Sequence, residues 1–89
     1  MCSFVVFSST KLESEEFDKA LKKVFHRGPD NKYSAIENGL YWGFNRLSIM
    51  DLSSNGNQPF KYNSCELVCN GEIYNYLSLK ELLSTEYKF

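Results

Sequence analysis

The second residue, Cys2, could carry catalytic chemistry once the initiator Met1 is removed, and cysteine is small enough to permit that removal. The new N-terminus would hold a thiol nucleophile and a free α-amine on one residue. An α-amine has a pKa of about 7.7–8.0, so much of it is unprotonated near neutral pH and can act as a base. This pairing is the logic of N-terminal nucleophile enzymes, although many proteins without that activity also have a small second residue. A retained Met1 would acylate the amine and remove the base.

The other two cysteines, Cys65 and Cys69, have the spacing C-x-x-x-C, which differs from the C-x-x-C of zinc and redox sites. Only His26 could complete a soft ligand set, so we expect no metal site. Three cysteines are too few, and odd in number, for a disulfide framework, which favours a reducing compartment. Their spacing on an apolar strand predicts that both side chains lie in the core.

The composition is that of one small globular domain. The chain has 89 residues, of which 43% are hydrophobic and 24% are charged. A domain of this size buries about 60–65% of the surface of its unfolded chain, so we expect modest stability. The net charge of −1 argues against a nucleic-acid binder. The apolar run Phe4 to Phe7 is too short for a signal peptide or a membrane span, which predicts a cytoplasmic protein without a membrane partner.

The first third of the chain predicts a buried strand followed by a helix. Residues Ser3 to Ser8 are β-branched and aromatic, and residues Ser14 to Phe25 carry one apolar stripe. Ser14 is the predicted N-cap. Gly28 is predicted to stand at C′, and Pro29 prevents the helix from continuing.

The rest of the chain predicts a hairpin, a loop, another strand and a second helix. Asn38-Gly39 joins predicted strands at 33–36 and 40–44, and residues 46–50 either extend the second strand or form a third. Residues 51–59 are predicted to form a loop. The remaining elements are a strand at 65–69 and a helix at 75–83. The order β-α-β-β-β-α predicts an α+β fold in which helices cover one face of a largely antiparallel sheet.

Four further segments stand in a fixed order behind Met1-Cys2-Ser3. They are His26-Arg27-Gly28-Pro29-Asp30, the run from Gly43 to Ser53, Gly56-Asn57-Gln58-Pro59-Phe60, and the run from Asn70 to Tyr76. This series resembles the N-terminal glutaminase domain of glutamine-dependent asparagine synthetases, which are class II glutamine amidotransferases. The resemblance runs from Cys2 to the end of the chain, and RLSIMDLS with NGEIYNY points to the asparagine synthetase branch.

The resemblance implies a role for five residues. Cys2 would attack the side-chain amide carbon of glutamine, and the Asn70 side chain and the Gly71 backbone N–H would stabilise the oxyanion. Arg46 would hold the substrate α-carboxylate, a task that suits its planar guanidinium. Glu72 would receive the α-amine. Taken without the resemblance, Asn70-Gly71 reads as an ordinary turn and Arg46 as a solvated charge.

For two residues of the segment 26–30, the sequence leaves open whether they act in the site or only support the structure. Arg27 and Asp30 lie in a segment that the family places near the pocket, and a structural role is as open for them as a direct one. Asp30 could cap the turn at Pro29, and His26 is interpreted as closing its helix.

The resemblance further implies that residues 1–89 are the N-terminal part of a type-2 glutamine amidotransferase domain. The parent fold is a four-layer αββα N-terminal-nucleophile sandwich with mostly antiparallel sheets. Its second substrate-binding carboxylate, its later strands and the synthetase domain would lie outside these residues. The glutaminase half needs no cofactor, whereas ATP and Mg would bind only the synthetase domain, which makes asparagine from aspartate. Glutamine is the expected ligand, and the synthetase domain or another copy of the chain are possible partners.

Two alternatives stay open. The chain could be an inactive amidotransferase-like fragment that only binds glutamine or a partner chain. It could also be an N-terminal nucleophile peptidase, although charges for both ends of a free amino acid argue against that reading.

Overall fold

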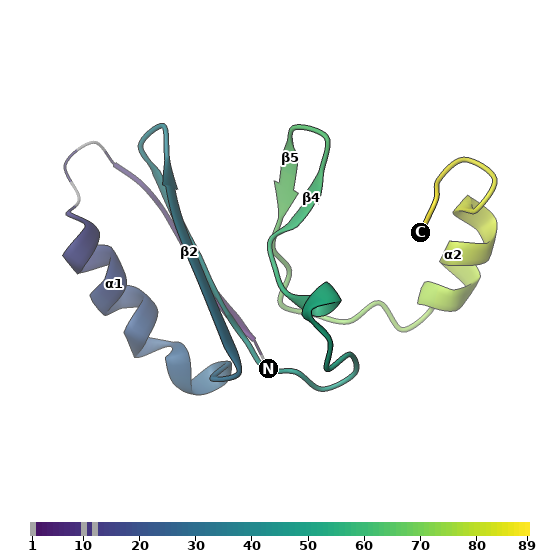
Figure 1. The fold of residues 1–89 in the computed structure, drawn as a ribbon, viewed down its shortest axis with the longest axis horizontal. Helices are drawn as coiled ribbons and strands as arrows, with labels where there is room; N and C mark the ends of the chain where they lie inside the picture. Colours follow the sequence, from purple (N-terminus) through teal and green to yellow (C-terminus); the bar gives the residue numbers. More distant parts are fainter. Residues whose placement is uncertain (1, 10, 12) are drawn as a thin grey trace.

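The structure is a computed structural model that describes residues 2–9, 11 and 13–89. Met1, whose removal would expose the Cys2 amine, lies outside the described residues. The chain is elongated, with a radius of gyration of 15.0 Å and extents of 45 × 28 × 18 Å. A compact domain of this length would have a radius of gyration of about 12 Å. Figure 1 shows why: the helix α2 lies away from the sheet at the other end of the molecule.

The main element is a three-stranded antiparallel sheet in the order β1-β3-β2. Its strands are β1 (Ser3–Ser8), β2 (Asn31–Glu37) and β3 (Leu40–Arg46). The predicted Asn38-Gly39 hairpin is confirmed, because both residues have positive φ angles, 51° and 76°, as a tight hairpin turn requires. Residues 47–50 continue neither strand and form no third one. The predicted α+β class with antiparallel pairing is therefore confirmed.

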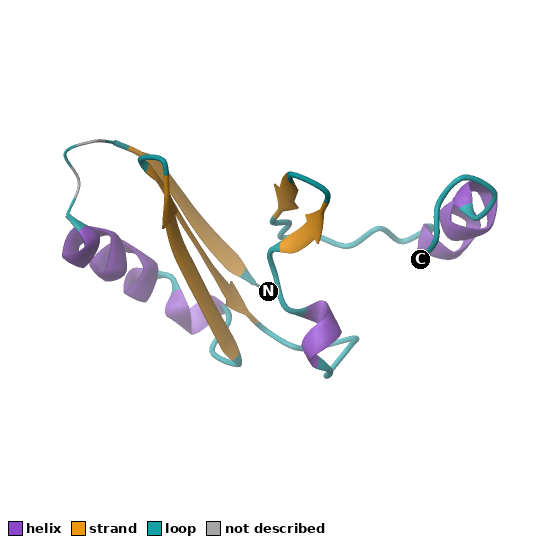
Figure 2. Ribbon diagram, turned by 45° about the horizontal axis from the view of Figure 1, so that its top comes forward, coloured by secondary structure: helices purple, strands orange, loops and turns teal. Residues whose placement is uncertain are grey.

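Helix α1 (Ser14–Lys23) covers one face of this sheet (Figure 2). Phe17 and Leu21 are buried against the strands, and Leu21 packs over Gly43, where a Cβ atom would lie 2.6 Å from the leucine side chain. The Phe17 and Tyr41 rings lie 5.6 Å apart. The opposite face carries the buried Trp42 and Phe44, so the core lies on both sides of the central strand β3.

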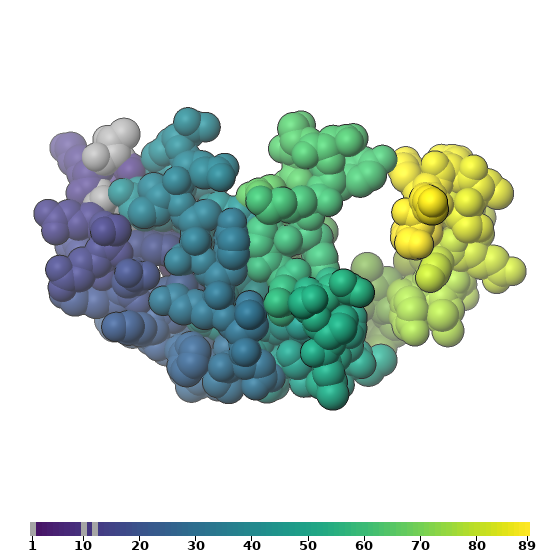
Figure 3. All heavy atoms as spheres, viewed as in Figure 1, coloured from purple at the N-terminus to yellow at the C-terminus, as the bar shows by residue number. Residues whose placement is uncertain are grey.

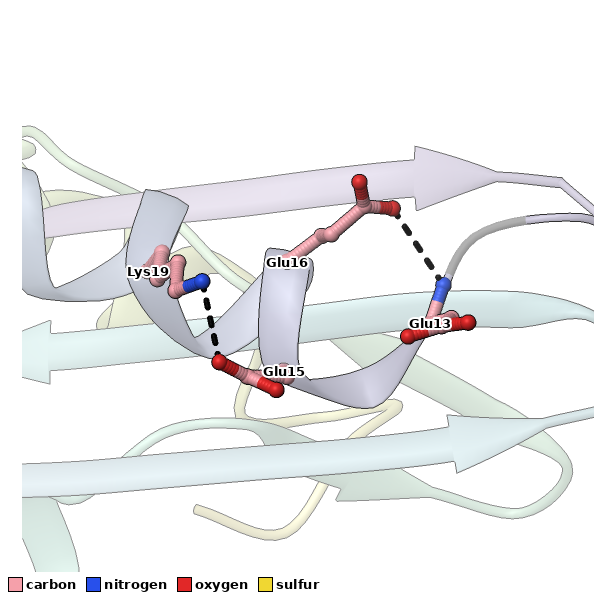
Figure 4. A network of polar contacts seen from close by, with 4 residues as sticks. All are labelled: Glu13, Glu15, Glu16 and Lys19. Carbon is pink, nitrogen blue, oxygen red and sulfur yellow. Dashed lines mark hydrogen bonds and ion pairs between the residues drawn. The ribbon is translucent and has the colours of Figure 1, made fainter.

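The ends of α1 differ from the prediction. The N-cap is Glu13 and not Ser14, because the Glu16 carboxylate reaches back to the Glu13 backbone N–H at 3.5 Å. Figure 4 shows this contact beside the ion pair of Glu15 with Lys19, 2.9 Å long. The helix ends at Lys23, two residues earlier than predicted, and a 3₁₀ turn at Phe25–Arg27 follows.

Gly28 is not a left-handed C′ residue, as its φ of −155° is extended. The glycine is needed for a different reason. A Cβ atom at this position would lie 2.8 Å from the Arg46 carbonyl carbon and still closer to the Asn45 carbonyl group. Glycine is therefore required because the backbone at residue 28 passes directly against the backbone of β3, and not because a helix ends here.

A second, two-stranded antiparallel sheet lies over the face of the first sheet that α1 leaves open (Figures 1 and 2). Its strands are β4 (Phe60–Tyr62), which the sequence did not predict, and β5 (Cys65–Leu67), which is shorter than the predicted 65–69. A 3₁₀ turn at Ser54–Gly56 lies within the predicted loop. Helix α2 (Tyr76–Leu83) begins one residue after its predicted start.

The expectation that both helices cover one sheet face is wrong for α2. This helix lies beyond the hairpin of β4 and β5, and Figure 3 shows open space between that hairpin and the C-terminal residues. Its Leu82 side chain is 72% exposed. An apolar stripe predicts that a helix will pack, but it does not specify the surface against which it packs.

Candidate active site

Cys2 lies directly before β1, beside the end of β3. The Leu47 backbone N–H donates to Cys2 Sγ at 3.4 Å, and the thiol donates to the Leu47 carbonyl at 3.7 Å. The Arg27 Nε–H donates to the Cys2 carbonyl at 3.4 Å. The thiol is half-buried and is one of three free cysteines in the chain. Contacts to the backbone and to the side chain thus hold Cys2 against the sheet.

The start of β1 is also fastened from the other face of the sheet. The fully buried Asn45 donates from Nδ2 to Ser3 Oγ and to the Leu21 carbonyl, each at 3.2 Å. The Ser3 hydroxyl in turn donates to the Val24 carbonyl at 2.9 Å. The residue after Cys2 is therefore tied both to β3 and to the end of α1.

A pocket of about 480 Å³ opens beside Cys2. All five residues that the resemblance selected line it, namely Cys2, Arg46, Asn70, Gly71 and Glu72. They come from three separate parts of the chain: the start of β1, the end of β3 and the segment after β5. The structure thus brings together residues up to 70 positions apart in sequence.

Arg46 is 6% exposed, and its guanidinium organises the loop that follows β3. Nη1 donates to the Ser53 carbonyl and to Asn57 Oδ1, each at 2.7 Å, and Nη2 donates to the Asp51 carbonyl. These contacts use three of the five guanidinium N–H groups. In the described ranges the Nε–H and one Nη2–H have no partner, which is enough for a two-point contact with a carboxylate.

Asp51 lies in this loop, and its carboxyl group has a lowered pKa. The hydroxyl of Ser53 and its backbone N–H, 2.8 Å from Oδ1, stabilise the charged form and lower the pKa of the Asp51 carboxyl below its usual value. The positive charge of Arg46 acts in the same direction. Because the pKa is lower in the folded chain, the stabilising contact is present above the unfolded pKa and is lost as the pH falls through the folded one.

Removal of the Ser53 hydroxyl should therefore raise the pKa of Asp51 toward that of an unperturbed aspartate, about 3.9. The measurement is a carbon-13 NMR titration of the Asp51 carboxyl in wild type and Ser53→Ala. The matched control is Ser54→Ala, whose hydroxyl makes no hydrogen bond in the described part of the chain, and which should leave the titration unchanged. An identical Asp51 midpoint in wild type and Ser53→Ala would contradict this account of the loop.

The opposite wall of the pocket is the segment from Cys69 to Glu72, which has no regular secondary structure. Within the residues described, the Asn70 and Glu72 side chains make no hydrogen bond or ion pair, and both residues are exposed. Their amide and carboxylate are thus available to a ligand in the pocket. This wall is fastened at Cys69, whose backbone makes two hydrogen bonds with the Gln58 side chain.

The interpretation of Cys65 and Cys69 as core residues is wrong. Both are exposed in this chain, because β5 ends at Leu67 and its hairpin has only β4 as a partner. Cys69 instead lines the pocket. The described residues contain no group of three or more His, Cys, Asp or Glu side chains that could hold a metal ion.

The segment 26–30 supports the site without lining the pocket. His26 Nδ1 lies 3.1 Å from the Lys23 carbonyl, which confirms that it closes α1. Asp30 does not cap the turn at Pro29: its Oδ2 accepts the Ser48 N–H at 2.7 Å, and its own N–H donates to the Arg46 carbonyl at 2.9 Å. Together with the contact of Arg27 to Cys2, these bonds join the segment to both Cys2 and Arg46.

Three residues that support the site were not assigned a role from the sequence, and two of them, Gly56 and Gln58, line the pocket. Gly56 lies against the Arg46 guanidinium, where a Cβ atom would collide with it, Asn57 accepts from that guanidinium, and Gln58 holds Cys69. In the sequence these residues belong to the motif Gly56 to Phe60, which contributes to the family resemblance but indicates no role for any of the three. The single available signal was this clustering of polar and glycine residues directly before a proline.

Known proteins are similar to this chain over nearly its whole length. The family model for the glutamine amidotransferase domain matches residues 1–89, so the chain belongs to the glutamine amidotransferase family. Asparagine synthetase [glutamine-hydrolyzing] 1 of Bacillus subtilis is 39% identical over 97% of this chain. A protein of Acanthamoeba polyphaga mimivirus, described as a probable glutamine-hydrolysing asparagine synthetase, is 42% identical over 93%, and the amidase chry2 of Gibberella zeae is 38% identical over 96%.

The chain spans only 15%, 16% and 13% of the lengths of these three relatives, in the same order. No solved structure matches the chain significantly. None of the helices in the described ranges is long and apolar enough to cross a membrane.

Proposed function

We propose that this chain carries the glutamine-hydrolysing site of an asparagine synthetase-type amidotransferase and that Cys2 is its nucleophile. The observation that carries the proposal is the shared pocket of Cys2, Arg46, Asn70, Gly71 and Glu72. The family membership and the names of the relatives support the same substrate.

The proposed reaction starts from a chain processed to expose the Cys2 α-amine. That amine takes the thiol proton, and Sγ bonds to the amide carbon of glutamine. The oxyanion that forms is stabilised by the Asn70 side-chain amide and the Gly71 N–H. The carbon–nitrogen bond then breaks, and ammonia leaves with the proton held by the α-ammonium. Water hydrolyses the γ-glutamyl thioester, which releases glutamate and restores the thiol.

Arg46 and Glu72 would select the substrate by its two charged ends. Two N–H groups of Arg46 have no partner among the described residues and suit the α-carboxylate, and the Glu72 carboxylate, which has no partner there either, suits the α-ammonium. In the parent enzyme we propose that the ammonia passes to a synthetase domain that uses ATP and Mg to convert aspartate into asparagine. The three free cysteines fit a cytoplasmic location.

Recognition of both ends predicts that free L-glutamine binds, whereas N-acetyl-L-glutamine, which lacks the positive charge, binds at least about tenfold more weakly. Calorimetric titration of the Cys2→Ala protein with each compound measures this without turnover. Glu72→Gln serves as the matched variant, in which the preference for the free amine should shrink. Equal affinities of wild-type Glu72 protein for the two compounds would rule out the proposed role of Glu72.

One observation favours a second function, the binding of a partner chain without catalysis. On the sheet face opposite α1, Phe4 is 46% and Val6 is 48% exposed, and both lie in the edge strand β1. Apolar side chains beside an unpaired strand edge are typical of a surface that another chain covers. A stably folded protein that binds no glutamine would favour this reading, whereas glutamine binding without ammonia release would favour an inactive fragment that only binds glutamine.

A further inference from the structure

The side chain of Gln58 makes a two-point contact with the backbone of Cys69. Its Nε2 donates to the Cys69 carbonyl at 3.0 Å, and its Oε1 accepts the Cys69 N–H at 2.6 Å. A primary amide offers a donor and an acceptor side by side, so it pairs with a residue's N–H and C=O as a neighbouring strand would. The orientation of the amide is fixed by chemistry, because the reverse orientation would set donor against donor.

This contact is the attachment of the segment that carries the proposed oxyanion donors. Strand β5 ends at Leu67 and α2 begins at Tyr76, with irregular structure between them. Across the part of the chain that the structure describes, Asn70 and Gly71 make no hydrogen bond of their own. The Gln58 contact at Cys69 is thus the hydrogen bond nearest in sequence to Asn70, and on the other side of Gly71 the next is that of the Ile73 carbonyl with the Tyr76 N–H.

Gln58 is itself placed by the loop that Arg46 organises. The neighbouring Asn57 accepts from Arg46 Nη1 at 2.7 Å and donates its backbone N–H to the Ser54 carbonyl at 3.0 Å. A continuous series of contacts therefore runs from Arg46 at the end of β3, through Asn57 and Gln58, to Cys69 and the donors beyond it. Gln58 is half-buried and lines the pocket with them.

We propose that Gln58 is a positioning residue, which fixes Asn70 and Gly71 opposite Cys2 by holding the Cys69 backbone. The proposal rests on the proposed function, since it concerns the donors of that reaction. Oxyanion donors act in the transition state, so their displacement lowers kcat more than it raises KM. A displacement of about 1 Å can reduce the rate about 100-fold.

The test compares Gln58→Met with Gln58→Glu. Methionine keeps the length of the side chain and loses both hydrogen bonds, whereas glutamate keeps an acceptor for the Cys69 N–H and loses the donor to its carbonyl. In Gln58→Met we expect amide hydrogen exchange at Cys69 to rise at least about tenfold and nitrogen-15 order parameters of Asn70 and Gly71 to fall. Gln58→Glu should retain much of the Cys69 protection. The melting temperature, measured alongside, separates these effects from general unfolding.

Ammonia release by the protein processed to Cys2 provides the second readout. We expect kcat to fall about 10- to 100-fold in Gln58→Met with KM changed less than about threefold. A rise in KM at constant kcat would mean direct substrate contact and would overturn the proposal. Unchanged exchange at Cys69 and unchanged order parameters of Asn70 and Gly71 would also overturn it. If wild type releases no ammonia, the proposed function fails, and the exchange and relaxation measurements alone decide the role of Gln58.

Discussion

Cys2→Ala should abolish ammonia release from glutamine, with a loss of at least about 1,000-fold relative to wild type. The thiol is the nucleophile that attacks the glutamine amide in the proposed reaction, and without it neither the first tetrahedral intermediate nor the thioester forms. The measurement is ammonia release from protein whose N-terminus is shown to be Cys2 by intact-protein mass spectrometry. Glutamine binding should persist, because the alanine variant keeps Arg46 and Glu72.

The matched variants separate the nucleophile from the other thiols. Cys65→Ala and Cys69→Ala also remove one exposed thiol each, and both should retain activity within a few-fold of wild type. For Cys69 this expectation has a structural basis, since Gln58 binds its backbone and not its sulfur. Equal ammonia release from wild type and Cys2→Ala would refute the catalytic role. Glutamine binding with no release from either protein would favour the non-catalytic alternative.

The secondary structure could be predicted where local chemistry decides it. Asn38-Gly39 can adopt positive φ angles with little strain, so the hairpin and the pairing of β2 with β3 followed from two residues. The predicted apolar stripe of Phe17, Leu21, Val24 and Phe25 likewise contains the two buried residues of α1, Phe17 and Leu21, but Phe25 lies beyond the helix and is 42% exposed. The N-cap of α1 was predicted one residue too late because serine is a preferred N-cap residue and glutamate is not. The Glu16 carboxylate, which reaches back to the Glu13 backbone N–H, shows where the helix starts.

Features that depend on tertiary packing could not be predicted in the same way. Cys65, in the β4–β5 hairpin, and Cys69, just after it, are exposed because no other part of the described chain packs over their side chains. An alternation with a period of two shows which side chains share a strand face, but not whether that face is covered. Gly28 was assigned to helix termination because glycine before proline is a strong local signal. The actual constraint is the backbone of β3, where Asn45 and Arg46, 17 and 18 positions further along the chain, lie close to Gly28.

The candidate site was accessible from the sequence only through the ordered motifs. These named the five residues that the structure places around one pocket, but not the residues that support them. Arg46 contacts the loop after β3, and Gln58 contacts Cys69, 11 residues away. Such bonds between side chains and backbone depend on the path of two loops, and neither loop carries a periodic pattern. Supporting residues of this kind therefore require a structure.

Gly28→Ala should destabilise the fold by about 2–3 kcal/mol, since it forces a methyl group into a backbone that has no freedom to move. The added Cβ would meet the carbonyl groups of Asn45 and Arg46, in the strand that pairs with both neighbours in the sheet. For a domain of this size, the melting temperature should fall by about 10–20 °C. Thermal unfolding followed by circular dichroism measures this change.

Gly71→Ala is the matched control for Gly28→Ala, because the same methyl group meets only Cys69 Sγ, at an ordinary contact distance of 3.8 Å. Gly71 has no positive φ angle and alanine keeps the backbone N–H, so its stability should change by less than about 0.5 kcal/mol. A shift of the backbone at Gly28 would also move Arg46, because the Arg46 carbonyl accepts the N–H of the nearby Asp30. Gly28→Ala should therefore weaken glutamine binding even at temperatures where it stays folded. Melting within about 3 °C of wild type would show that the crossing of these two segments is not the constraint on residue 28.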